Sequence, residues 1–136
     1  MVSFKEDNPL NNAIPKEYFN DFNNQIKCVK DTVLTLEEAI KLMEKDCIPE
    51  MEDKCKIVME LEKEGKNHQD KIKEGVAKGL FLGPNGMKYT EISSLVGEIG
   101  QNAKSISELL TNLNGEKLSK DLVKDFVKLI ETDESI

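Results

Sequence analysis

Residues 19–47 read FNDFNNQIKCVKDTVLTLEEAIKLMEKDC, and their apolar residues recur at alternating spacings of three and four. The positions are Phe19, Phe22, Ile26, Val29, Val33, Leu36, Ile40, Met43 and Cys47. This repeat places all of them in a narrow stripe on one side of a single long helix. Such a stripe is buried by other helices that lie nearly parallel to it. The stretch therefore predicts an all-α fold, an antiparallel bundle with coiled-coil-like packing.

The remaining sequence predicts further helices around this first one, which we expect over residues 15–45. A second helix is expected over 49–80, a third from Thr90 to about 113, and a shorter fourth over 118–130. The expected buried faces are Met51, Cys55, Val58, Leu61, Ile72, Val76 and Leu80 on the second helix, and Ile92, Val96, Ile99, Ala103, Ile106, Leu110 and Leu113 on the third. We expect one domain over 15–131, a flexible arm over 1–14 and a frayed C-terminus over 132–136.

Pro49 leaves the relation between the first two helices open. The repeat continues through it from Cys47 to Met51 and Cys55, so a kinked continuous helix fits the pattern. The alternative is a tight reversal at 46–49, although no Gly or Asn is present there to ease it. We favour the reversal, because short connections between antiparallel helices are usual in bundles.

Composition argues against several classes of partner. The chain has a net charge of −7, and all 19 cationic residues are Lys, with no Arg. Nucleic acids and anionic membranes both require clustered cations, so we expect neither as a partner. No secretory signal or membrane-length apolar run is visible. The three cysteines, at 28, 47 and 55, have no metal-ligand spacing, so a cytoplasmic protein without metal or cofactor is predicted.

No catalytic constellation is visible, and we do not expect an enzyme. The only histidine, His68, lies in a segment, His68-Gln69-Asp70-Lys71, that partly resembles histidine phosphotransfer domains. Lys71 matches the cation that steadies the phosphate in those bundles, whereas Ile72 stands where they have a small residue. Because His68 falls on the expected buried side of its helix, we interpret it as structural. Phosphotransfer remains an alternative function, and exposure of His68 would favour it.

Small residues mark two places where helices can come close together. Gly65 interrupts the apolar face of the second helix, and a cavity there would support a second alternative function, a carrier of a small apolar ligand. On the third helix, small residues at Ser94, Gly97, Gly100 and Ala103 would let a neighbouring helix approach closely.

The segment 79–86, Gly-Leu-Phe-Leu-Gly-Pro-Asn-Gly, predicts a turn between the second and third helices. Phe81 and Leu82 are large apolar residues in a connection that should be polar. They are the candidate partner-binding residues, although packing on the end of the bundle is the favoured interpretation, because apolar loop residues usually pack on their own domain. The sequence therefore predicts a non-enzymatic protein–protein interaction module, an adaptor, chaperone or assembly subunit, with self-association as the other possibility.

Overall fold

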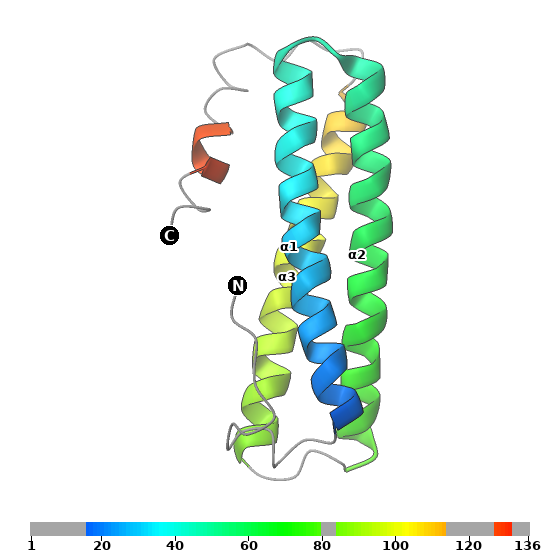
Figure 1. The fold of residues 1–136 in the computed structure, drawn as a ribbon, viewed down its shortest axis with the longest axis vertical. Coiled ribbons are helices and arrows are strands. Elements are labelled where there is room, and N and C mark those ends of the chain that lie inside the picture. Colours follow the sequence, from blue (N-terminus) through cyan, green and yellow to red (C-terminus); the bar gives the residue numbers. More distant parts are fainter. Residues whose placement is uncertain (1–15, 80–83, 114–126, 132–136) are drawn as a thin grey trace.

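The computed structural model describes residues 16–79, 84–113 and 127–131 and shows an all-α bundle (Figure 1). Its three long helices are α1 (Lys16–Glu44), α2 (Ile48–Ala77) and α3 (Pro84–Asn112). They run up, down and up beside one another, and each pair of helices is in contact. Residues 127–131 form a short C-terminal helical segment. The predicted fold class is therefore confirmed.

Several sequence predictions lie outside the described residues. These are the arm over 1–14, the frayed end over 132–136, Leu80, and residues 118–126 of the predicted fourth helix. No helix in the described part of the chain combines the length and the apolar character needed to span a membrane.

The chain reverses between α1 and α2, as predicted, and Asp46 makes the reversal possible. Its φ of 59° is left-handed, a conformation that Asp adopts more easily than most residues. The Cys47 amide donates to the Leu42 carbonyl at 2.9 Å, and the Asp46 amide donates to the Met43 carbonyl at 3.1 Å. This pair of bonds is a Schellman motif, which satisfies the last carbonyls of a helix. Pro49 then lies in the first turn of α2, where it needs no amide partner.

The start of α3 differs from the prediction. The helix begins at Pro84, six residues before Thr90, so Pro84, Asn85 and Gly86 of the predicted turn are helical. Proline suits a first helical position because its φ is already fixed near the helical value. Thr90 is therefore inside the helix, where its hydroxyl donates to the Met87 carbonyl at 2.7 Å. At the other end of the turn, Gly79 follows α2 with a φ of 72°, as a helix-ending glycine should.

Two apolar clusters hold the helices together. The upper apolar cluster, next to the α1–α2 reversal, consists of Leu36, Ala39, Ile40, Met43, Met51, Cys55, Val58, Ala103 and Leu110. The lower apolar cluster, at the opposite end, consists of Phe19, Phe22, Ile72 and Tyr89. The rings of Phe22 and Tyr89 meet edge to face with centroids 4.9 Å apart, a favourable aromatic geometry.

The predicted buried faces are correct for most of α1 and α2. Leu36 and Ile40 are buried, whereas Ile26 and Val33 are only partly buried. The buried surface of α1 is wider than the predicted stripe, because α1 contacts both other helices. It also includes Gln25, Cys28, Thr32, Glu37 and Ala39. On α2, Val76 is 42% exposed because the adjacent Gly75 takes the buried position.

The predicted face of α3 is partly wrong. Ile92 and Ile99 are exposed, and the buried residues of α3 are Gly86, Tyr89, Ser93, Gly100, Ala103, Ser107 and Leu110. The helix is rotated so that its small and polar residues meet α1 and α2. The reason is steric, since Gly100 already lies so near α1 that an added Cβ would be 3.3 Å from a Val29 methyl group. Of the four small residues predicted to allow a close approach, Gly100 and Ala103 are buried, whereas Gly97 is only partly buried and Ser94 is exposed. The prediction is therefore correct for two of these positions, and the close contact at Gly100 leaves Ile92 and Ile99 outside the interface.

Candidate functional site

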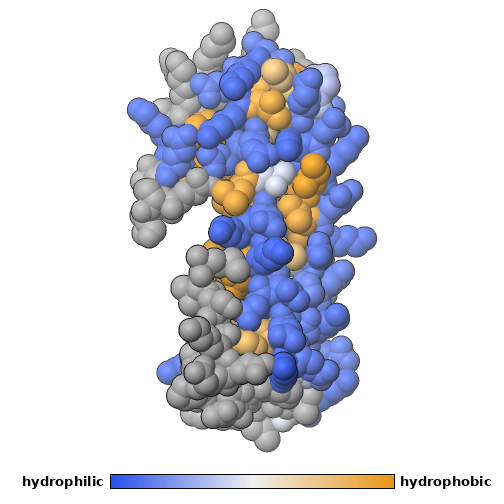
Figure 2. Space-filling model, in the orientation of Figure 1, coloured by the Kyte–Doolittle hydropathy of each residue, from blue (hydrophilic) through white to orange (hydrophobic). Residues whose placement is uncertain are grey.

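The rotation of α3 leaves a strip of large apolar side chains on the surface. Ile92, Leu95, Ile99 and Leu109 are 41%, 60%, 52% and 58% exposed, and we call them the apolar α3 face. Their spacings of three, four and ten residues keep them on one side of the helix. The view onto α1 in Figure 2 differs, because that surface is mainly hydrophilic and is broken only by small apolar patches.

The C-terminal segment of the chain packs against the upper apolar cluster. Ile106 is partly buried against the upper apolar cluster, and Val127 and Ile130 of the C-terminal segment pack there too. An ion pair of 3.3 Å between Lys41 Nζ and Glu131 Oε1 fixes the segment to α1. This part of the bundle therefore packs against a short helical segment through its apolar side chains. Lower on α3, the exposed Glu91 and Glu98 flank Leu95 at i−4 and i+3, and the exposed Lys88 lies one turn below Ile92. The border of the face beside Leu95 is therefore acidic, and its lower end carries one cation.

Between the two apolar clusters lies a central polar layer, made of Asp21, Gln25, Cys28, Gly65, His68 and Ser93. Gln25 is fully buried and pairs with Ser93 of α3 in both directions. The Gln25 side-chain amide donates to the Ser93 carbonyl at 2.9 Å, and the Ser93 hydroxyl donates to Gln25 Oε1 at 2.6 Å. Because both partners are satisfied, the pair fixes the register of α1 against α3 at small energetic cost.

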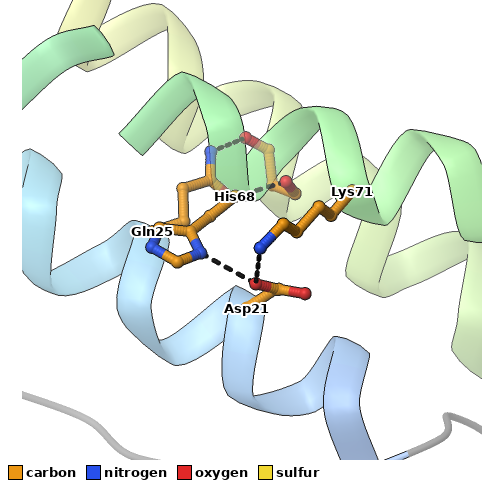
Figure 3. Close-up of polar contacts among 5 residues, drawn as sticks. Asp21, Gln25, His68 and Lys71 are labelled. Carbon is orange, nitrogen blue, oxygen red and sulfur yellow. Dashed lines mark hydrogen bonds and ion pairs between the residues drawn. The ribbon is translucent and has the colours of Figure 1, made fainter. Parts of the chain in front are cut away.

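His68 forms the second contact of this layer (Figure 3). Its Nδ1 lies 2.8 Å from Asp21 Oδ1, and its side chain is 19% exposed. Lys71 Nζ lies 3.9 Å from the same Asp21 oxygen. His68 is therefore partly buried, and Lys71 faces a carboxylate. This arrangement fits a structural role for His68 better than the phosphotransfer alternative, which needs an exposed ring.

Cys28 and Glu64 complete a cluster around His68. The thiol of Cys28, a carboxylate oxygen of Glu64 and a ring nitrogen of His68 all lie within 4.8 Å of one another. Cys28 is buried, and burial raises the pKa of its thiol, with smaller contributions from the nearby Glu64 and Asp31 charges. The sequence predicts no metal site, because its three cysteines have no metal-ligand spacing. Cys28 and His68 are forty residues apart and come together only in the folded chain. The signal that was available was the i, i+4 spacing of Glu64 and His68, which puts both on one helix face.

Gly65 lets α1 and α2 approach closely beside the cluster of Cys28, Glu64 and His68. A Cβ at position 65 would lie 3.2 Å from Cys28 Cβ and 3.8 Å from a Val29 methyl group. The space opened by the missing side chain is thus filled by α1, which leaves the apolar-carrier alternative without a cavity at that position. The more apolar of two grooves between α2 and α3 lies elsewhere, lined by Cys55, Met59, Ser107 and Thr111 together with polar neighbours.

Phe81 and Leu82, the partner-binding residues predicted from the sequence, lie outside the described residues. No protein-family model matches this chain, and neither a curated protein nor a solved structure is significantly similar to it.

Proposed function

We propose that this protein is a non-enzymatic interaction module that binds an amphipathic helix of a partner protein on the apolar α3 face. The observation that carries the proposal is the exposure of Ile92, Leu95, Ile99 and Leu109 on one side of a helix. Scattered apolar residues on a surface are ordinary, whereas an aligned strip of this kind usually marks an interaction site. A helix laid along such a strip would bury its own apolar residues at matching three- and four-residue spacings.

The charge of the surface specifies the partner further. Glu91 and Glu98 border the strip, and the whole chain carries a net charge of −7. A partner helix with Lys or Arg beside its apolar face would therefore associate faster and bind in one orientation. The three cysteines are free thiols. Free thiols suit a reducing compartment, and we place the interaction in the cytoplasm.

Site-specific photo-crosslinking in the native cell tests this proposal. A crosslinker at Leu95 should capture one protein through an amphipathic, basic-flanked helix, as identified by mass spectrometry of the joined peptides. The matched control is a crosslinker at Asn67, an exposed position on α2 that does not line the groove between α2 and α3. A synthetic peptide of the captured helix should then bind the purified chain, and Leu95→Glu should weaken that binding at least about tenfold.

Two results would contradict the proposal. Crosslinks from Leu95 to residues 114–136 of the same chain would show that the protein covers this face itself. A purified chain that dimerises, and becomes monomeric with Leu95→Glu, would identify a second copy as the occupant. Circular dichroism of Leu95→Glu should match that of the unmodified chain, because Leu95 is 60% exposed.

A further inference from the structure

We propose that Cys28, Glu64 and His68 form a zinc-binding site that links α1 to α2 across the central polar layer. This site is independent of the apolar α3 face. The three donor atoms lie within 4.8 Å of one another and come from two different helices. In a tetrahedral zinc site the donors are about 3.2 to 3.8 Å apart, so small side-chain rotations bring these three to coordinating distance.

The donor set fits zinc in its chemistry. A thiolate, an imidazole and a carboxylate are the three side-chain ligands that Zn²⁺ accepts, and water can fill the fourth position. The thiolate and the carboxylate together would neutralise the charge of the ion, with the thiol proton released to solvent. Mg²⁺ and Ca²⁺ prefer sites made of oxygen donors, and a thiolate ligand selects against both.

The surroundings of His68 support the assignment. Asp21 Oδ1 holds His68 Nδ1 at 2.8 Å, so the second nitrogen, Nε2, is left for a metal. Figure 3 shows this nitrogen on the side of the ring away from Asp21. A carboxylate that accepts from the non-ligating nitrogen is the usual outer partner of a zinc-bound histidine, because it fixes the ring and its tautomer. Asp21 would thus be a positioning residue and not a ligand.

Burial gives the site both a closed and an open side. Cys28 is buried, His68 is partly buried and Glu64 is exposed, so an ion can enter from solvent. Gly65 permits the close approach of the two helices that brings Cys28 into the cluster. Because large apolar side chains are replaced here by polar groups and a glycine, a bound ion would join α1 and α2 where apolar packing contributes least.

Titration of the purified, metal-free chain with Zn²⁺ tests the proposal. Calorimetry should show one ion per chain with micromolar or tighter affinity, and the melting temperature should rise with zinc concentration. Co²⁺ should give the near-ultraviolet charge-transfer absorption of a cobalt–thiolate bond. His68→Gln and Cys28→Ser should each weaken binding at least about 100-fold, and Cys28→Ser should also abolish the absorption. Asp21→Asn should weaken binding about 10- to 100-fold without changing the stoichiometry.

Matched controls separate this site from adventitious binding. Cys47→Ser removes a thiol from the α1–α2 connection, and Glu60→Gln removes an exposed carboxylate one turn before Glu64, and both should bind Zn²⁺ normally. Absence of saturable binding at 100-fold excess of Zn²⁺ over protein would overturn the proposal. An unchanged zinc affinity of His68→Gln would also overturn the proposal. Because His68 is only partly buried, this variant tests zinc binding even if Cys28→Ser fails to fold.

Discussion

The upper apolar cluster and the central polar layer use different means to hold the same three helices together. In the upper apolar cluster, Leu36, Ile40, Met51 and Val58 are at most 3% exposed, and burial of apolar area supplies the stabilisation. In the central polar layer, the equivalent positions carry Gln25, Gly65 and Ser93, and stabilisation comes from paired hydrogen bonds and close backbone approach. The contrast suggests that the upper cluster provides stability and the central layer provides register, because polar pairs tolerate only one alignment.

The largest effect is expected in the upper apolar cluster. Leu36→Ala should lower the free energy of unfolding by about 2–4 kcal/mol, since it removes buried methyl groups and leaves a cavity. Urea denaturation followed by circular dichroism measures this loss. Leu34→Ala is the control, because Leu34 is 38% exposed on the same helix, and it should cost less than about 1 kcal/mol. If the two variants were equally stable, the upper apolar cluster would not be the region that provides stability.

A second test concerns close packing in the central polar layer. Gly65→Val should cost about 1–3 kcal/mol, because even its Cβ would lie 3.2 Å from Cys28 Cβ on the neighbouring helix. The control is Gly97→Val on α3, where the atoms nearest to the new Cβ belong to the flexible amide end of Gln69. That amide can move aside, so we expect a change within about 0.5 kcal/mol. Equal losses in the two variants would show that helix separation at Gly65 is not critical.

The buried polar pair allows a smaller but more specific test. Ser93→Ala should cost about 1–2 kcal/mol, because Gln25 Oε1 would lose its hydroxyl donor in a fully buried position. Ser105→Ala is the matched control, since the exposed Ser105 hydroxyl donates only to the carbonyl of Gln101 in its own helix. Chemical denaturation of both variants gives the difference. A Ser93→Ala variant as stable as the unmodified chain would remove the energetic basis for the proposed register role.

The smallest expected effect is a loss of stability at alkaline pH, to which buried groups in the two apolar clusters contribute together with Cys28 of the central polar layer. Burial raises the pKa of the Cys55 thiol and that of the Tyr89 hydroxyl above their ordinary values. As pH rises, these groups ionise first in the unfolded chain, which then binds fewer protons than the folded state. Stability is therefore fully present below about pH 9 and falls above it. Urea midpoints at pH 7.5 and pH 10 should differ less in a Cys55→Ala/Tyr89→Phe variant than in the unmodified chain. An unchanged difference would assign the alkaline loss to other groups.

The sequence by itself determined the fold class, the bounds of α1 and α2 within a few residues, and the upper apolar cluster. These features depend on local periodicity, and Leu36, Ile40, Met51 and Val58 fit one pattern because they are large and apolar. The reversal at Asp46 was predicted from the usual topology of bundles, but the residue that makes it was not. Asp is less common than Gly or Asn in that conformation, and its use there depends on the hydrogen bonds around it.

Only the tertiary structure decided which side of α3 is buried and which polar residues meet. Two faces of α3 have a helical period, one made of large apolar residues and one of small residues. Periodicity alone predicts that the face of large residues is the buried one. Close contact with α1 at Gly100 and the pairing of Ser93 with Gln25 select the small ones, and Leu95 and Ile99 are left exposed. In the same way, Cys28 and His68 come together only because α1 and α2 are antiparallel and aligned at Gly65. Distances between helices are set by packing, which no local pattern in the chain encodes.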